Sequence, residues 1–321
     1  MTPAPQATDA ITGFTRAQDR MLDRYHVDAE SRFVDIPMLD GRAHVLVAGD
    51  GPPVVMAIGG GMVAAMWAPL MERLDGFTLY AFDPPGHGLS DPATYRTETL
   101  RATSVGFLEQ LLDGLGLVRP PFIAQSMGGL WSTWFALDRH DRASAIAYIG
   151  CPALMLGSSA PLPLRLSTIR LLRRLLTRLD PPSPKQVDRL AAIAGERFTD
   201  LPELRDLFVA YEKLPGTPPV LLALHRSLIR VRGARAEVEL TATELARVTQ
   251  PVQLIWGEND PFGSPSLGRQ AADIIPSAEL HLVGGGHGPW FTRSEAIGPI
   301  VTEFLHQQAS PATNTRGGRS R

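Results

Sequence analysis

The stretch that decides the fold runs from Phe122 to Gly129 and has the sequence FIAQSMGG. Its first residues are apolar and predict a short buried strand, and a segment with helical spacing follows over Met127–Leu137. Ser126 lies between the two, at a sharp turn where the backbone must approach its neighbours closely, so small residues are needed on both sides. Such a turn can present a serine as a nucleophile, although a serine at a helix N-cap would give the same local pattern.

Strand-like segments are spaced along the chain on both sides of this turn. We predict strands over Arg32–Pro37, Ala43–Ala48, Val54–Ile58, Thr78–Phe82, Phe122–Gln125, Ala145–Ile149, Val252–Trp256 and Glu279–Val283. The first two flank Asp40-Gly41, a hairpin signal, and the later ones are short apolar runs typical of strands buried on both faces. Helical patterns alternate with them over Thr94–Leu115, Met127–Leu137, Ser266–Ile275 and Ile297–His306. The alternation predicts an α/β fold with an eight-stranded, mostly parallel sheet flanked by helices.

One long interval, from about residue 152 to residue 248, breaks this alternation because it holds helical patterns and proline clusters but no convincing strand. We therefore predict a helical cap over 152–248, inserted between the sixth and seventh strands. The core is expected over residues 31–151 and 249–307, with an N-terminal extension at 1–30. The polar segment 308–321, rich in Gly and Arg, is predicted to be a disordered tail.

Composition argues against several classes of function. A formal net charge of -2 over 321 residues gives no basic field of the kind that nucleic-acid binding requires. Cys151 is the single cysteine, so no intramolecular disulfide can form, and the N-terminus lacks the features of a secretory signal. The uncharged stretch Pro52–Met71 contains a glycine run and a proline, which favour a strand, a turn and a helix start over a membrane span. We expect a cytoplasmic protein without stable membrane insertion, and the sequence leaves the oligomeric state open.

A glycine run follows the third predicted strand, where Ile58–Met62 has the sequence IGGGM. Acyl transfer develops negative charge on an oxygen, and backbone N–H groups aimed at that oxygen lower the barrier. Glycines allow the backbone to come close enough for this. We predict that the N–H groups of Gly60 and Met127 form an oxyanion hole, although an ordinary tight turn would show the same pattern.

Two later strands end in groups that can activate a serine. The seventh predicted strand leads to Asp260, and the eighth leads to His287 within the glycine-rich stretch GGGHG. A histidine can take the serine proton near neutral pH, and a carboxylate can fix its tautomer and offset its charge. We predict Ser126, Asp260 and His287 as the catalytic triad, with Glu258 as the alternative carboxylate.

The order serine, aspartate, histidine, each directly after a strand, resembles the α/β-hydrolase superfamily over about residues 31–307. The segment DPPGHGLS at Asp83–Ser90 is similar to a further segment of that family, and we interpret His87 there as a turn-stabilising residue. Two positions depart from the family pattern: Ala124 replaces the first glycine of the serine turn, and Ile58 stands where many relatives have a histidine. The resemblance implies catalysis at the carboxyl edge of the sheet.

The predicted cap carries the main clues to substrate. Its segment Leu162–Leu179 is rich in leucine and arginine, which suits a lid, a patch that touches membranes or anionic acyl carriers, or plain packing of leucines with solvated arginines. We predict an apolar substrate pocket lined by residues close in sequence to the catalytic loops: Gly59, Gly61, Met62, Trp131, Met155 and Trp290.

Together these features lead to the hypothesis of a serine hydrolase that cleaves a carboxylic ester of a small to medium, mainly apolar molecule, with no metal or organic cofactor. Its partner would be the small-molecule ester, with no nucleic acid. A carbon–carbon bond hydrolase of ring-cleavage dienoates is the nearest alternative, because capped enzymes of that kind share a Ser-Met-Gly-Gly elbow. A thioesterase, an acyltransferase or a lactonase would also fit, and a non-catalytic small-molecule binder or an interaction module fits less well.

Overall fold

The structure is a computed structural model that describes residues 5–309 of the chain. Eight strands form one sheet in the order β1-β2-β4-β3-β5-β6-β9-β10, in which β2 alone runs antiparallel to its neighbours. The strands are β1 (Ala29–Ile36), β2 (Gly41–Ala48), β3 (Pro53–Ala57), β4 (Thr78–Phe82), β5 (Phe122–Ala124), β6 (Ile146–Ile149), β9 (Val252–Gly257) and β10 (Ala278–Val283). The predicted eight-stranded, mostly parallel sheet is therefore confirmed.

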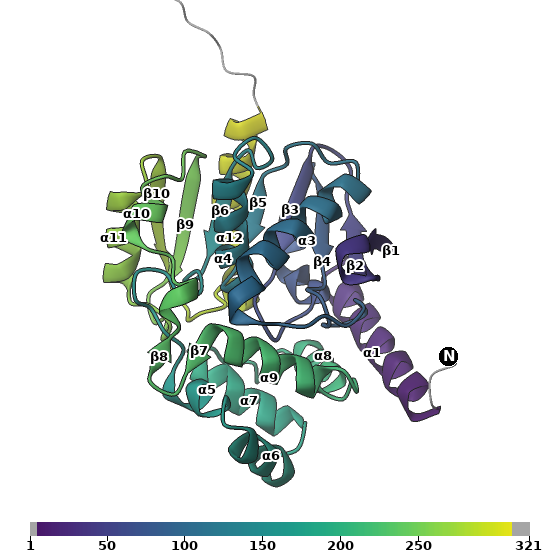
Figure 1. Cartoon of the computed structure of the whole chain (residues 1–321). Helices are drawn as coiled ribbons and strands as arrows, with labels where there is room; N and C mark the ends of the chain where they lie inside the picture. Colours follow the sequence, from purple (N-terminus) through teal and green to yellow (C-terminus); the bar gives the residue numbers. More distant parts are fainter. Residues whose placement is uncertain (1–4, 310–321) are drawn as a thin grey trace, which may run out of the picture.

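Helices cover both faces of this sheet (Figure 1). One face packs against α1 (Pro5–Arg24), α2 (Ala68–Met71) and α12 (Trp290–Ala309), and the other against α3 (Leu100–Gly114), α4 (Met127–Asp138) and α11 (Pro265–Ile274). Successive residues of β3 alternate between the two apolar layers: Val55 and Ala57 belong to one and Val54 and Met56 to the other. A strand buried on both faces needs such a continuous apolar run.

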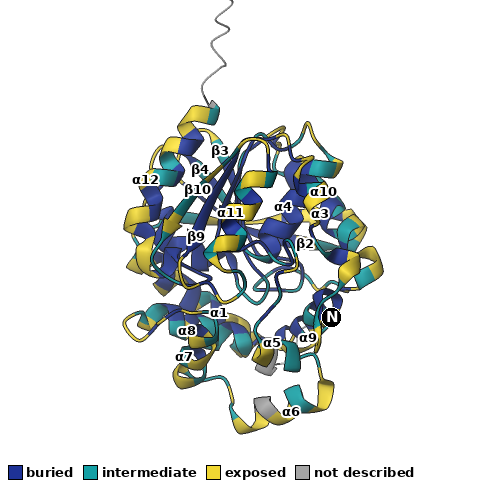
Figure 2. Cartoon of the chain, turned by 90° about the vertical axis from the view of Figure 1, so that its left-hand side faces the viewer, coloured by how far each residue is buried: buried dark blue, intermediate teal, exposed yellow. Residues whose placement is uncertain are grey.

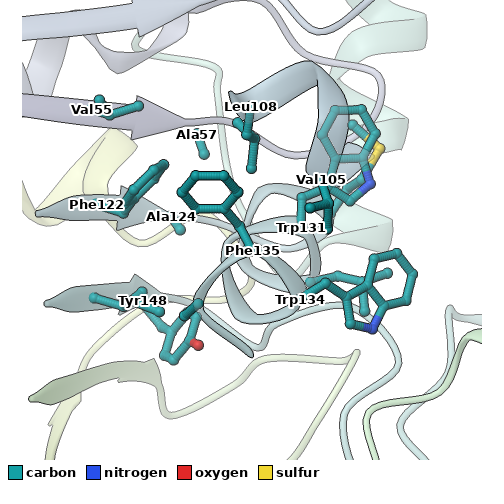
Figure 3. Packing of buried hydrophobic residues seen from close by; sticks show 14 of the residues in the cluster. Val55, Ala57, Val105, Leu108, Phe122, Ala124, Trp131, Trp134, Phe135 and Tyr148 are labelled. Atoms are coloured by element: carbon teal, nitrogen blue, oxygen red, sulfur yellow. The ribbon is translucent and has the colours of Figure 1, made fainter. Parts of the chain in front are cut away.

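The helix that follows the serine turn is buried along nearly its whole length (Figure 3). Its Phe135 ring lies 5.7 Å from the ring of Phe122 on β5, and its Trp131 ring lies 6.1 Å from Phe107 on α3. Burying aromatic side chains of this size contributes about 2–3 kcal/mol each. The packing fixes α4, and with it the turn at its first residue, against the centre of the sheet.

Residues 152–248, which we call the helical insertion, lie between β6 and β9 in the chain and beyond the carboxyl ends of the strands (Figure 1). The insertion contains α5 (Leu162–Leu166), α6 (Arg170–Leu179), α7 (Pro184–Ile193), α8 (Pro202–Glu212), α9 (Thr217–Leu228) and α10 (Ala242–Leu245). It also contains a small hairpin of β7 (Ile229–Arg230) and β8 (Gly233–Ala234), so the expectation of no strand there was wrong. Each of these strands is only two residues long, which is too short to leave a periodic pattern in the sequence.

The leucine-rich segment of the insertion is two helices rather than one continuous helix. The hydroxyl of Ser167 donates to the carbonyl of Leu164 at 2.6 Å, and that of Thr168 donates to the carbonyl of Arg165 at 2.7 Å. Such side-chain bonds compete with the helical ladder and end α5 before α6 begins at Arg170.

Both ends of the described chain are helical. The N-terminal helix α1 packs against α8 of the helical insertion, where Arg20 lies 3.6 Å from Asp206. At the other end α12 extends to Ala309, so the tail predicted over 308–321 begins too early by two residues, and the remainder lies outside the described residues. Within residues 5–309 no helix has the length and apolar character needed to cross a membrane.

Candidate active site

The three residues predicted as a triad lie at the carboxyl ends of neighbouring strands. Ser126 follows β5, Asp260 follows β9 and His287 follows β10, and these strands share one half of the sheet. Nδ1 of His287 lies 3.0 and 3.1 Å from the two carboxylate oxygens of Asp260. Ser126 and His287 line the same cavity. Segments far apart in sequence thus bring a hydroxyl, an imidazole and a carboxylate into one place.

Ser126 occupies a strained backbone conformation at the first turn of α4, with φ 48° and ψ -113°. A positive φ is costly for a residue with a side chain and persists only where the surroundings enforce it. Gly128 allows the close approach, because a Cβ there would meet the carbonyl oxygen of Ala57 on β3. The methyl group of Ala124, which departs from the usual glycine, is fully buried beside the turn. The hydroxyl of Ser126 is therefore held at the N-terminus of a 12-residue helix, where the dipole favours negative charge.

Asp260 is buried, and both of its carboxylate oxygens accept hydrogen bonds. One oxygen accepts from the backbone N–H of Cys151 at 2.9 Å and the other from the N–H of Phe262 at 2.8 Å, in addition to the imidazole. Hydrogen bonds of this kind fix a carboxylate in position. Glu258, the alternative carboxylate, is exposed to solvent two residues earlier. The geometry therefore pairs the histidine with Asp260 and not with Glu258.

The imidazole of His287 is fixed in both position and tautomer. Its ring stacks on Phe262 with 3.8 Å between ring centroids and 19° between planes. Because Nδ1 contacts a carboxylate, the proton of the neutral ring resides there, and Nε2 is left as the acceptor. Nε2 is buried and makes no hydrogen bond with any described residue. A ring held in this way can accept a proton at Nε2 from a group in the cavity.

The helical insertion holds the loop that carries this histidine. One carboxylate oxygen of Glu196 accepts from the N–H groups of Gly286 at 2.8 Å and Gly288 at 3.0 Å, and the N–H of His287 donates to the carbonyl of Ala194 at 2.8 Å. Burial raises the pKa of Glu196, while the two N–H bonds act in the opposite direction. The sequence analysis missed Glu196, because a lone glutamate in a loop between helices belongs to no recognisable pattern.

The glycine run lies directly against the serine turn. A Cβ on Gly59 would lie 3.1 Å from the Cβ of Ser126, and one on Gly60 would lie 2.7 Å from a methyl group of Leu224 in α9. Gly61 has φ +82°, which favours glycine. The loop therefore fits between the turn at Ser126 and the helical insertion only because its glycines lack side chains.

The side chain of His87 contacts the backbone of this glycine loop. Its Nε2 accepts from the N–H of Gly61 at 3.3 Å, and its Nδ1 lies 3.1 Å from the carbonyl of Pro85. Burial lowers the pKa of His87 to about 4, so the ring is neutral at pH 7 and can make both contacts. A polar side chain thus reaches the glycine loop even though Ile58 stands where many relatives have a histidine.

Two joined cavities open above the triad. A small one of about 100 Å³ is lined by Ser126 and Met127, and a large one of about 500 Å³ extends through the helical insertion. Both have Gly60, Phe262 and His287 in their walls, so the imidazole lies where they meet. A bond held over Ser126 would therefore place one part of a substrate in each cavity.

The residues predicted to contact substrate divide into two groups. Gly61, Met62 and Trp290 line the large cavity, and Met62 also lines the small one. Trp131 instead packs in the core, where its ring lies 6.2 Å from that of Tyr95 (Figure 3), and Met155 is buried in a bridge to the chain near Leu240. Gly59 contacts the serine turn rather than either cavity. Trp131 lies five residues after Ser126, which turns its side chain about 140° around the helix and away from that of Ser126.

A polar group of the helical insertion lines the large cavity and was not predicted. Nδ1 of His225 lies 3.0 Å from the hydroxyl of Ser167 and 3.4 Å from the guanidinium of Arg173. Burial, with a smaller contribution from the positive charge of Arg173, lowers the pKa of His225 to about 3. The hydroxyl of Ser167 donates to Leu164, so its oxygen can accept a proton from Nδ1, whereas the guanidinium of Arg173 can only donate to Nδ1; the two contacts therefore require opposite tautomers of the ring. His225 lines both cavities, so a neutral imidazole that can form hydrogen bonds lies where the two cavities meet.

Similarity to known proteins agrees with this geometry. A family model of the alpha/beta hydrolase fold matches residues 52–293. The chain is 26% identical over 284 residues to a 2-hydroxy-6-oxononadienedioate/2-hydroxy-6-oxononatrienedioate hydrolase of Pseudomonas sp, covering 86% of this chain and 96% of that protein. It is 25% identical over 284 residues to a 2-hydroxy-6-oxo-6-phenylhexa-2,4-dienoate hydrolase of Burkholderia cepacia, with the same coverage.

Solved structures show the same fold. A carboxylesterase from Bacillus subtilis superimposes with a TM-score of 0.70 at 21% identity, covering 92% of this chain and 98% of that one. A 2-hydroxy-6-oxo-6-phenylhexa-2,4-dienoate hydrolase from Rhodococcus gives a TM-score of 0.71 at 22% identity, covering 87% and 99%. Fold, site and relatives together define a hydrolytic enzyme. The family model spans most of the chain, and the protein belongs to the α/β-hydrolase fold family.

Proposed function

We propose that this enzyme is a serine hydrolase that cleaves carboxylic esters of small to medium, mainly apolar molecules, with Ser126, His287 and Asp260 as its triad. The observation that carries the proposal is the pair of cavities that meet at His287, one of them lined by Ser126. The helical insertion acts as the cap that encloses them. The proposal places the scissile carbonyl over Ser126 and one side of the ester in each cavity.

Each step of the proposed reaction uses a group in the position described. The Oγ of Ser126 attacks the ester carbonyl while its proton passes to Nε2 of His287, and Asp260 stabilises the imidazolium. The N–H groups of Gly60 and Met127 receive the oxyanion, and each such donor is worth about 10²–10³ in rate. The C–O bond then breaks as His287 protonates the leaving alcohol. Water gives a proton to His287, attacks the acyl-enzyme and releases the acid, which restores the serine.

The walls of the cavities support an uncharged substrate. In the described part of the chain, no lysine or arginine lines the small cavity. In the large cavity Arg173 is attracted by Glu212, and Arg189 forms an ion pair with Asp180, so the charge of each arginine has a compensating carboxylate. A substrate with its own carboxylate would compete with Asp180 and Glu212 for these arginines, whereas an apolar ester would not.

The experiment is hydrolysis of p-nitrophenyl esters of increasing acyl length by the native enzyme, by Ser126→Ala and by the exposed control Ser277→Ala. We expect turnover by the native enzyme and the control, and a fall in kcat of about 10⁵–10⁶ in Ser126→Ala. The acyl length at which kcat/KM falls would measure the cavity that receives the acyl chain. Equal turnover by all three proteins would show that Ser126 is not the nucleophile.

Carbon–carbon bond hydrolysis of ring-cleavage dienoates is the second candidate, favoured by the names of the curated relatives whose full length the chain nearly covers. A dienedioate carries two carboxylates, which the compensated arginines do not favour. Loss of the visible absorbance of a dienoate, together with no turnover of any ester, would replace our proposal with this one. Release of a free thiol from acyl thioesters would instead identify a thioesterase.

A further inference from the structure

The helix α6 of the insertion exposes an apolar surface to solvent. Leu171, Leu175 and Leu179 are 80%, 51% and 74% exposed, and they follow one another at intervals of four residues. Positions i, i+4 and i+8 lie along one side of a helix, so the three leucines form a continuous stripe. Two further exposed apolar residues, Leu162 and Ile169, lie in the chain just before it.

A basic stripe accompanies the leucines. Arg170, Arg174 and Arg178 are also exposed and each precedes a leucine of the stripe by one residue, so the two stripes lie next to each other. The ten residues of α6 include four arginines and no acidic residue, whereas the whole chain has a formal net charge of -2. Figure 2 shows α6 at the lower edge of the molecule with exposed residues along it.

The opposite side of the same helix faces the large cavity. Arg173 lines it, as do Asp180 at the end of α6 and Arg189 of α7. The side chains of Asp180 and Arg189 are 37% and 56% exposed while they line this cavity, so the cavity meets solvent beside α6. The leucine and arginine stripes therefore lie next to an opening of the substrate cavity.

We propose that α6 is an interfacial helix that docks the enzyme on the surface of an anionic lipid bilayer. Leucines enter the boundary between headgroups and acyl chains, and the neighbouring arginines meet the anionic headgroups, which are the two contributions that bind an amphipathic helix to a membrane surface. Docking brings the edge of the large cavity beside α6 close to the bilayer, from which an apolar substrate can enter. The docking itself does not depend on the reaction catalysed.

The test is flotation of the full chain with vesicles of phosphatidylcholine alone or mixed equally with phosphatidylglycerol. We expect binding to the anionic vesicles and at least tenfold less to the neutral ones. The variant Leu171→Ser/Leu175→Ser/Leu179→Ser and the variant Arg170→Gln/Arg174→Gln/Arg178→Gln should each lose binding, the second by about a hundredfold from about fivefold per arginine. The control Val118→Ser/Arg119→Gln alters an exposed apolar residue and an exposed arginine before β5, at the opposite end of the sheet, and should bind as the native chain does.

A second measurement places the helix directly. Cys151 is buried and burial raises its pKa, so a cysteine introduced by Leu175→Cys can be labelled selectively with an environment-sensitive fluorophore. We expect a blue shift of emission with anionic vesicles, and none for the same label at Val118→Cys. Ser126→Ala should bind vesicles as the native chain does, which separates this proposal from the proposed reaction.

Three results would overturn the proposal. One is the absence of binding to anionic vesicles. Another is binding that survives the leucine substitutions but not the arginine substitutions, which is the purely electrostatic behaviour that an acidic protein partner would share. The third is a native dimer, measured by light scattering, that the leucine substitutions convert to a monomer without changing vesicle binding.

Discussion

The sheet core and the helical insertion differ in how their buried charged and polar side chains are held. In the core, Asp260 is held by two backbone N–H groups and by His287, and every donor comes from a loop that directly follows a strand. In the insertion, Arg173 and His225 contact each other from two different helices, and the exposed leucines of α6 lie close by. The core therefore holds Asp260 and His287 in one arrangement through several hydrogen bonds, while the insertion shapes the cavities around them. Substitutions in the two regions should then differ in which kinetic constant they change.

The largest effect is expected from a change of one atom in the core. Asp260→Asn keeps the shape of the side chain but removes the charge that fixes the tautomer of His287, so kcat should fall by about 10⁴ with little change in KM. Glu258→Gln alters the exposed carboxylate two residues away and should leave kcat within twofold. Steady-state kinetics on the best p-nitrophenyl ester would measure both, and a similar loss in the two variants would contradict the assignment of the acid.

Glu196 belongs to the helical insertion, yet its carboxylate binds the loop of the core that carries His287. Substituting it tests whether the insertion helps to position the histidine. Glu196→Ala removes the acceptor for Gly286 and Gly288, and a displaced base can cost about 10² in kcat. Glu237→Ala, which removes an exposed carboxylate of the same insertion, is the matched control. If kcat is unchanged in Glu196→Ala, the core alone positions the histidine.

The core and the insertion should both contribute to the pH dependence of the free energy of unfolding. The folded-state pKa of His87 in the core is lowered to about 4 and that of His225 in the insertion to about 3, from an ordinary value of 6.5. Below pH 6.5 the unfolded chain takes up these protons and the folded chain does not, so stability falls as pH decreases towards the folded values. Between pH 7 and pH 5 each histidine should lower the free energy of unfolding by about 2 kcal/mol.

Urea denaturation of His225→Gln would isolate the contribution of the insertion. The loss of stability between pH 7 and pH 5 should be smaller by about 2 kcal/mol than in the native chain, because glutamine takes up no proton. An unchanged pH dependence would show that His225 is solvated enough to titrate normally in the folded state.

The smallest effect is expected at the boundary of the two cavities. His225→Phe keeps a ring but removes both ring nitrogens, so KM should rise by about tenfold for esters with a second polar group near the carbonyl. The KM of simple alkyl esters and kcat for both kinds should change less than twofold. A fall in kcat without a change in KM would instead assign His225 to the chemical step.

The same contrast explains what could be predicted from the sequence. The eight strands could be predicted from local apolar runs, and the order serine, aspartate, histidine from the residues that directly follow three of these runs. Both features depend only on neighbours in the sequence. Glu196 and His225 could not be predicted, because their roles depend on contacts with residues 90 and 58 positions away. Trp131 was assigned to the pocket on proximity in sequence alone, although the helix turns it into the core.

The hydrogen bonds between residues 194–196 and the loop of His287 limit which part of the insertion can move when substrate and product are exchanged. A cover that lifted away in one piece would take Ala194 and Glu196 with it and release the base at each opening. Residues 194–196 of the insertion are thus tied to the loop that carries His287, and exchange of substrate and product has to leave this part of the insertion in place. If the rest of the insertion moves while residues 194–196 stay in place, product can leave and substrate can arrive without displacing the imidazole of His287 from Asp260.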